Sequence, residues 1–183
     1  MIIDVIKTIE SSNNQYAFRF EEKLYFLHRA SKTNLSKVLK RVRMLNQCSN
    51  DTVLMICSTS WGLYQILGIN IYGMCGYDKS IVNYLKSKDD QDKIFKTFCD
   101  IQKIDLEKTE KELINITGQV NKNKNLFKNN LEMISFLEEE LRDRKENYLN
   151  LIRFVERFNG AKYMSNSFMD YLLRMISEAK KYK

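Results

Sequence analysis

The sequence contains no proline and only six glycines among its 183 residues. Proline and glycine are the residues that most often interrupt helices and form tight turns, so their scarcity permits long helices and disfavours a turn-rich sandwich or barrel. A chain of this length can bury a single core. We therefore expect a mainly α domain.

Long apolar runs are also missing. No stretch of about 18 apolar residues occurs, and the opening MIIDVIKTIESSNNQ carries Asp4 where a signal peptide has a basic start and an apolar stretch. The composition, 44% hydrophobic and 29% charged, is typical of a soluble globular protein. The sequence predicts a protein made in the cytoplasm without a signal peptide and without stable insertion into a membrane.

Residue types that bind metals or form nucleophilic pairs are few. His28 is the single histidine, and the four cysteines are spaced 9, 18 and 24 residues apart, without CxxC spacing. This pattern disfavours a zinc site, a Cys-His pair and a Ser-His-Asp triad. We expect free thiols, no metal and no cofactor, and carboxylates as the proton-transfer groups of any enzyme activity.

The net charge of +7 points to a polyanionic partner, which is nucleic acid, an acidic membrane surface or the bacterial cell wall. Residues 107–148 hold nine acidic and eight basic residues, so the rest of the chain carries a net charge of +8. No motif for reading nucleic acid is present. The sequence thus favours wall polymer over nucleic acid as the partner of the basic surface.

Apolar spacing outlines the secondary structure. Residues 1–11 have helical spacing and run into the turn-prone SSNN, which places Glu10 in the last turn of a helix. Residues 16–20 alternate between aromatic and other side chains, as in a short strand or small hairpin. A basic amphipathic helix is expected at 34–47, and a helix, a turn at 159–160 and a second helix are expected in 149–183.

An apolar residue recurs every seven positions from Leu106 to Val155. The partner positions three residues further on are only partly filled, which favours a helical hairpin over one uninterrupted coiled coil. We predict that 107–148 form such a hairpin, turning near 118–125 and inserted into a domain made of 1–106 and 149–183. The repeat is interpreted as an internal packing seam, with self-association or docking of a partner through 107–148 as the alternative.

Three separated segments carry the candidate chemistry: IESS at 9–12, SWGLYQILG at 60–68 and RFNGAKY at 157–163. In this order they resemble the phage-type N-acetylmuramidases, the peptidoglycan-degrading endolysins of the lysozyme superfamily. The resemblance covers about 1–104 and 150–176, and the middle segment is its most specific part. The order Glu-Ser, Gly-Leu-x-Gln and Asn is shared more loosely with lytic transglycosylases.

The resemblance implies a lysozyme-like domain with a small β-hairpin after the catalytic helix. It also implies a glycoside hydrolase that cleaves peptidoglycan between N-acetylmuramic acid and N-acetylglucosamine, in phage lysis or in local opening of the cell wall. Such an enzyme acts on the periplasmic or cell-wall peptidoglycan after release or delivery. The alternatives are a lytic transglycosylase that gives 1,6-anhydro products, and a catalytically silent helical scaffold or nucleic-acid-binding protein.

Glu10 is the expected general acid. Partial burial and the negative end of a helix dipole both raise a carboxyl pKa, which keeps the group protonated so that it can donate to the leaving oxygen. Glu21 is either a second catalytic carboxylate or a structural residue that caps backbone groups.

The expected substrate-binding residues are of two kinds. The amides of Gln65 and Asn159 suit sugar hydroxyl and acetamido groups. The rings of Trp61, Tyr64 and Tyr163 offer flat surfaces to pyranose faces. A place in the core is an equally good interpretation of Trp61.

Overall fold

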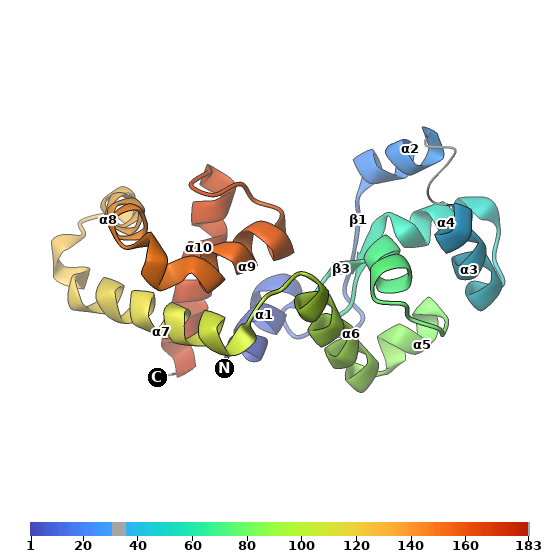
Figure 1. The fold of residues 1–183 in the computed structure, drawn as a ribbon, viewed down its shortest axis with the longest axis horizontal. Coiled ribbons are helices and arrows are strands. Elements are labelled where there is room, and N and C mark those ends of the chain that lie inside the picture. Colours follow the sequence, from blue (N-terminus) through green and yellow to red (C-terminus); the bar gives the residue numbers. More distant parts are fainter. Residues whose placement is uncertain (31–35, 183) are drawn as a thin grey trace. The chain divides into compact units, whose positions relative to one another are not determined.

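The computed structural model describes residues 1–30 and 36–182 (Figure 1). Its architecture is mainly α with a small antiparallel sheet, which confirms the expected fold class. The chain divides into two compact units, one made of Glu10–Ile101 and the other of Met1–Ile9 with Gln102–Lys183. Each unit is described by itself below.

The unit of Glu10–Ile101 contains the sheet and six α-helical or π-helical elements among its described residues. These elements are β1 (Phe18–Phe20), α2 (Glu22–Ala30), α3 (Ser36–Asn46), α4 (Asn50–Cys57), β2 (Thr59–Trp61), β3 (Ile66–Leu67), the π-helical turn η1 (Asn70–Met74), α5 (Ile81–Lys86) and α6 (Lys88–Ile101). The helix expected at 34–47 is α3, and residues 34 and 35 of that prediction lie outside the described residues.

The sheet has the order β1-β2-β3, and both pairs of strands are antiparallel. Phe18 is paired with Trp61, and Phe20 with Thr59. The strand predicted after the first helix is therefore present, but its partner β2 lies about forty residues further along the chain. Residues 62–65 form the tight connection that joins β2 to β3.

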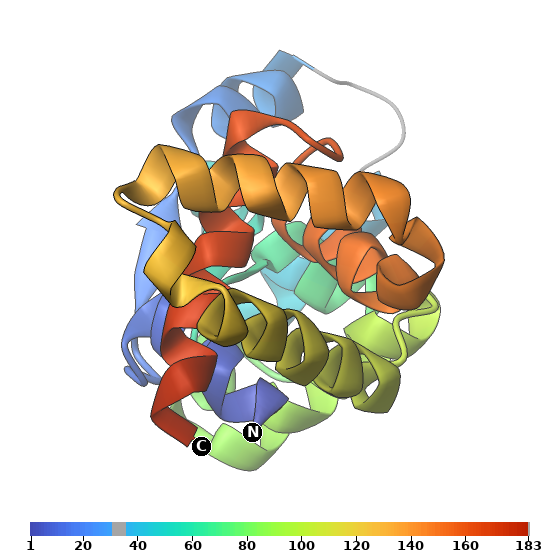
Figure 2. The ribbon, with the colours of Figure 1, turned by 90° about the vertical axis from the view of Figure 1, so that its left-hand side faces the viewer.

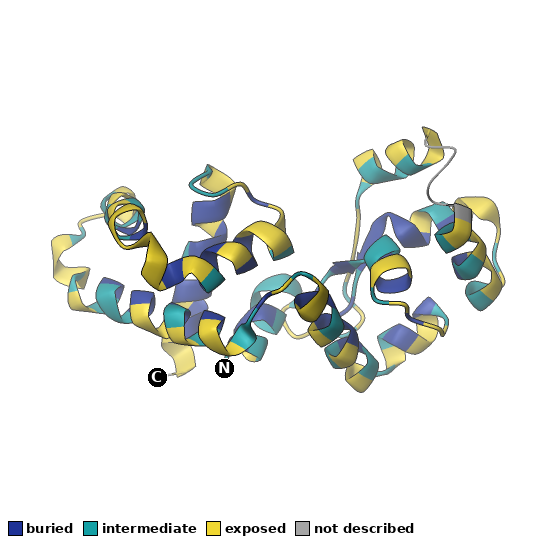
Figure 3. Ribbon diagram, in the orientation of Figure 1, coloured by how far each residue is buried: buried dark blue, intermediate teal, exposed yellow. Residues whose placement is uncertain are grey.

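The core of this unit is aromatic. The ring of Tyr64 stacks on Phe95 of α6, with 4.1 Å between centroids and 3° between planes. Tyr84 of α5 is also fully buried. Apolar residues at helical spacing give α6 a buried face, which includes Ile94 and Phe98 (Figure 3).

The second unit is entirely helical in its described residues. It contains α1 (Ile2–Ser11) as far as Ile9, α7 (Leu106–Lys122), the 3₁₀ turn η2 (Lys124–Leu126), α8 (Asn130–Asp143), the 3₁₀ turn η3 (Lys145–Tyr148), α9 (Leu149–Asn159), α10 (Asn166–Ala179) and the 3₁₀ turn η4 (Lys180–Tyr182). Helices α7, α9 and α10 pack against one another. Figure 2 shows this unit with α7 and α8 facing the viewer.

Five of the eight positions of the seven-residue repeat are buried, namely Leu113, Val120, Leu141, Tyr148 and Val155, whereas Leu106, Phe127 and Ile134 are half-buried. The bend between α7 and α8 falls at 123–129, later than predicted, since α7 continues through Gly118. Burial of the neighbouring Thr117 and Val120 offsets the cost of about 1 kcal/mol that a glycine adds inside a helix.

Residues 107–148 fall in the same compact unit as 149–183. The carboxylate of Glu112 in α7 accepts hydrogen bonds from the side-chain amide of Asn150, at 2.6 Å, and from the backbone N–H of Leu151, at 2.7 Å. This division of the chain differs from the one expected from the sequence. The insertion predicted from the sequence is untested, and these contacts with Asn150 and Leu151 argue that 107–148 contribute to the packing of the unit.

Within the described residues, no helix combines the length and the apolar character needed to cross a membrane.

Candidate active site

Glu10 lies where the sequence predicts it, in the last turn of α1, and its side chain is half-buried. The helix ends at Ser11, and Ser12 and Asn13 follow with positive φ angles of 53° and 62°. Ser and Asn tolerate this left-handed backbone better than branched residues do. The backbone N–H of Asn14 then donates to the carbonyl of Ser11, at 3.0 Å, which closes a tight turn directly after the candidate acid.

This turn is tied to the middle motif by backbone hydrogen bonds. The carbonyl of Asn14 accepts from the N–H of Ala17 at 3.1 Å, and the carbonyl of Ala17 accepts from the N–H of Gly62 at 2.8 Å. The segment after Glu10 therefore lies against the turn that joins β2 to β3. Two of the three motifs found in the sequence come together within one unit.

Gln91 of α6 forms hydrogen bonds with both segments that meet at this junction. Its side-chain oxygen accepts from the N–H of Leu63 at 2.7 Å, and its Nε2 donates to the carbonyls of Gln15, Tyr84 and Leu85 at 3.1–3.2 Å. The side chain is fully buried. A Cβ on Gly62 would lie 2.4 Å from Oε1 of Gln91, so the close approach requires a glycine at position 62.

Gln65, an expected sugar ligand, is half-buried in the same turn and has a φ of 49°. Its backbone N–H and its side-chain Nε2 both donate to the carbonyl of Gly62, at 3.3 and 3.0 Å. The amide thus helps to hold the turn in its left-handed conformation. Its contact with substrate stays a prediction.

Trp61 has a structural role in β2. Its indole N–H donates to the carbonyl of Ile56 at 2.9 Å, and its ring lies 6.1 Å from that of Phe18 on the neighbouring strand. A Cβ on Gly68 would lie 2.0 Å from the same Ile56 oxygen. The glycine of the motif therefore leaves room for this contact, and Trp61 remains half-buried.

Tyr64 lies in the core, although the sequence predicted that its ring would contact a sugar. It is fully buried, stacks on Phe95 and donates from its hydroxyl to Asp92 at 2.6 Å. A sugar platform needs an accessible ring face, and in this structure the ring of Tyr64 belongs to the core. Its position gives no support to a contact with substrate.

Glu21 follows β1 directly. Its carboxylate is paired with Nε of Arg19 at 2.6 Å, its N–H donates to the carbonyl of Ser58, and its carbonyl accepts from the N–H of Tyr25 in α2. These backbone contacts are made by the main chain of Glu21 and not by its carboxylate, so the capping role of the side chain stays a prediction. The side chain is about one-third exposed, and its catalytic role is untested.

Asn159 and Tyr163 belong to the all-helical unit. Asn159 is the exposed last residue of α9. The hydroxyl of Tyr163 donates to the carbonyl of Leu141 at 3.1 Å, Nζ of Lys145 lies 4.8 Å from its ring centre, and burial raises its pKa. Their participation with Glu10 in one sugar cleft stays a prediction.

Two buried or half-buried polar residues near the sheet were not predicted from the sequence. Gln91 had one available signal, since it occupies the apolar face of α6 together with Ile94, Phe95 and Phe98. His28, whose Nδ1 lies 2.9 Å from Oγ of Ser58, had none. Among the described residues, no group of three or more His, Cys, Asp or Glu side chains could hold a metal ion.

No family model matches the chain, and no solved structure matches it significantly. The chain is similar to the protein named Endolysin of Enterobacteria phage PRD1, with 31% identity over 96 residues. This match covers 52% of the present chain and 64% of that protein, somewhat less than two thirds of its length. The similarity supports an assignment to the phage endolysins, in agreement with the resemblance found in the sequence.

Proposed function

We propose that this protein degrades bacterial peptidoglycan by cleaving the bond between N-acetylmuramic acid and N-acetylglucosamine, with Glu10 as the general acid. The observation that carries the proposal is the junction after α1, where the Ala17–Gly62 hydrogen bond ties the segment following Glu10 to the SWGLYQILG motif. Similarity to a phage endolysin supports the degradation of peptidoglycan. The enzyme is made in the cytoplasm and reaches the wall after release or delivery.

In the proposed reaction, Glu10 donates its proton to the glycosidic oxygen as the bond to the muramyl C1 breaks. The carbohydrate then carries the developing positive charge of an oxocarbenium-like transition state, and water completes the hydrolysis. Glu21 is our candidate for the second carboxylate that orients this water. Gln65, Asn159, Tyr163 and the half-buried Trp61 are the candidates for sugar binding.

The test of the acid is Glu10→Gln, because an amide cannot donate a proton as a carboxylic acid does. We expect at least about a hundredfold loss in the rate at which isolated peptidoglycan loses turbidity. Glu146→Gln, at an exposed carboxylate of η3, makes the same change of charge and should keep full activity. Circular dichroism would verify that both variants fold. Undiminished lysis by folded Glu10→Gln would refute the assignment.

A lytic transglycosylase is the second candidate reaction, because the Glu-Ser and Gly-Leu-x-Gln skeleton is shared with that group. Mass spectrometry of the soluble fragments distinguishes the two. A hydrolase leaves reducing ends, whereas attack by the muramyl 6-hydroxyl leaves 1,6-anhydro ends. We expect reducing ends. A protein that releases no fragments and binds nucleic acid at physiological salt would instead fit the non-catalytic alternative.

A further inference from the structure

Helix α2 exposes large apolar side chains. None of its nine residues is buried (Figure 3). Phe26 is 56% exposed and Leu27 is 61% exposed. A helix on the surface of a soluble domain normally turns its apolar stripe toward the core, so this arrangement indicates a partner that takes up apolar groups.

The same part of the sequence is strongly basic. Residues 23–50 contain seven Lys or Arg and no Asp or Glu. Lys37, Lys40 and Arg43 are exposed on α3, and next to them Met44 is 74% exposed. The nearest acidic residues along the chain are Glu22 and Asp51, which flank the basic stretch at its two ends.

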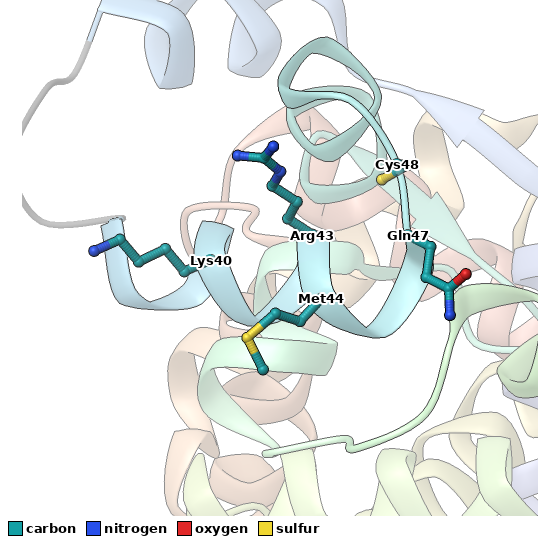
Figure 4. Close-up of a pocket in the computed structure, with 5 residues that line it drawn as sticks. All are labelled: Lys40, Arg43, Met44, Gln47 and Cys48. Atoms are coloured by element: carbon teal, nitrogen blue, oxygen red, sulfur yellow. The ribbon is translucent and has the colours of Figure 1, made fainter.

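Part of α3 borders an open hollow of about 560 Å³. It is lined by Lys40, Arg43, Met44, Gln47 and Cys48. Figure 4 shows that the side chains of Lys40, Arg43 and Met44 extend away from the helix in different directions, and that Gln47 and Cys48 follow its C-terminal end. Cations and an apolar thioether therefore share one depression in the surface.

Helices α2 and α3 both pack on α4, so they are held on one scaffold within their unit. Their exposed side chains are named here the α2–α3 surface. It consists of Lys23, Phe26, Leu27 and Arg29 from α2 and of Lys37, Lys40, Arg43 and Met44 from α3.

We propose that the α2–α3 surface binds an anionic phospholipid bilayer without spanning it. The cations pair with lipid phosphates, and Phe26, Leu27 and Met44 enter the boundary between headgroups and acyl chains. Charge complementarity favours an acidic partner, and the apolar groups favour lipid over nucleic acid, because phosphate contacts alone would leave Leu27 and Met44 in water. This binding is independent of catalysis at Glu10.

The test is co-sedimentation of the full chain with vesicles at physiological salt. One set of vesicles is pure phosphatidylcholine and the other contains 30 mol% phosphatidylglycerol. We expect binding to the anionic vesicles only. Each cation near such a surface strengthens binding about fivefold, so Lys40→Gln/Arg43→Gln should weaken it about 25-fold. Phe26→Ser/Leu27→Ser should weaken vesicle binding at least tenfold.

Two matched control variants lie in the other unit. Lys124→Gln/Lys128→Gln makes the same change of charge at exposed lysines, and Leu126→Ser/Leu131→Ser removes two exposed leucines. Both should bind vesicles within about twofold of wild type, because the attraction of a charge to the bilayer acts only close to its surface. All four variants should still cleave isolated peptidoglycan, which separates this proposal from the proposed function.

Failure of the wild-type protein to bind anionic vesicles would overturn the proposal, as would equal binding to both kinds of vesicle. Equal losses of vesicle binding in the control variants would also overturn it, because they would show that binding depends on total charge or hydrophobicity and not on the α2–α3 surface. If Phe26→Ser/Leu27→Ser left vesicle binding unchanged and the wild type bound soluble nucleic acid tightly, the proposal would be overturned. The α2–α3 surface would then bind a polyanion and not a bilayer.

Discussion

The buried side-chain oxygen of Gln91 accepts a hydrogen bond of 2.7 Å from the backbone N–H of Leu63. The two residues lie 28 positions apart in the sequence, on α6 and in the turn between β2 and β3. Through this contact the helix supports the motif whose Gly62 is hydrogen-bonded to the segment that follows Glu10.

Gln91→Leu should destabilise the protein by about 3 kcal/mol, because it removes the buried acceptor of the Leu63 N–H and the donor to the carbonyls of Gln15, Tyr84 and Leu85. Urea unfolding followed by circular dichroism measures this change. Gln119→Leu, at a half-exposed position of α7, is the control and should shift the free energy of unfolding by less than about 0.5 kcal/mol. Equal stability of the two variants would show that the Gln91 contacts contribute nothing net.

Gly68→Ala should cost about 3 kcal/mol or more, since its Cβ would lie 2.0 Å from a backbone oxygen that cannot easily move. Gly76→Ala provides the comparison. No atom lies within 4 Å of a Cβ at that position, and only the left-handed φ of 71° opposes the change, at about 1–2 kcal/mol. Thermal unfolding of both variants tests the order. A smaller loss for Gly68→Ala than for Gly76→Ala would contradict the structure around Ile56 and Trp61.

His28 should make the stability fall as the pH decreases below about 6.5. Burial lowers its pKa below the ordinary value of 6.5. Well above pH 6.5 the ring is neutral in both states, whereas near and below pH 6.5 the unfolded chain takes up a proton more readily than the folded protein. We expect the free energy of unfolding to fall between pH 7.5 and pH 5.5. His28→Gln should remove this part of the fall, and parallel profiles for the two proteins would exclude His28 as its source.

Replacing 107–148 by a Gly/Ser linker tests whether this segment is a dispensable insertion. Leu113, Ile116 and Val120 of α7 are buried, and α7 packs on α9 and α10, so removal would expose apolar faces of the remaining helices. We expect the deletion to abolish cooperative unfolding. Replacing only 124–129, where η2 has no buried residues, should leave the transition intact. A folded deletion protein that cleaves peptidoglycan would instead establish the insertion predicted from the sequence.

Local patterns predicted the helices well, because helical periodicity depends on residues only three or four positions apart. The end of α1 at Ser11 and the turn after Asn159 followed from apolar spacing and from turn-forming residues. The partner of β1 did not, since pairing between Phe18 and Trp61 depends on chain folding over more than forty residues. The bend after α7 was misplaced because packing of α7 outweighs the preference of Gly118 for a turn.

By itself, the sequence determined the mainly α class, the position of Glu10 at a helix end and the resemblance to phage muramidases. Only the tertiary structure decided which motif residues face the core. Tyr64 stacks on Phe95, and the indole N–H of Trp61 donates a hydrogen bond to the carbonyl of Ile56. The side chain of Gln91 accepts a hydrogen bond from the N–H of Leu63 in the motif. The physical reason is that burial depends on which distant segments meet. The residues around Tyr64 in the sequence are the same whether its ring contacts a sugar or another aromatic ring.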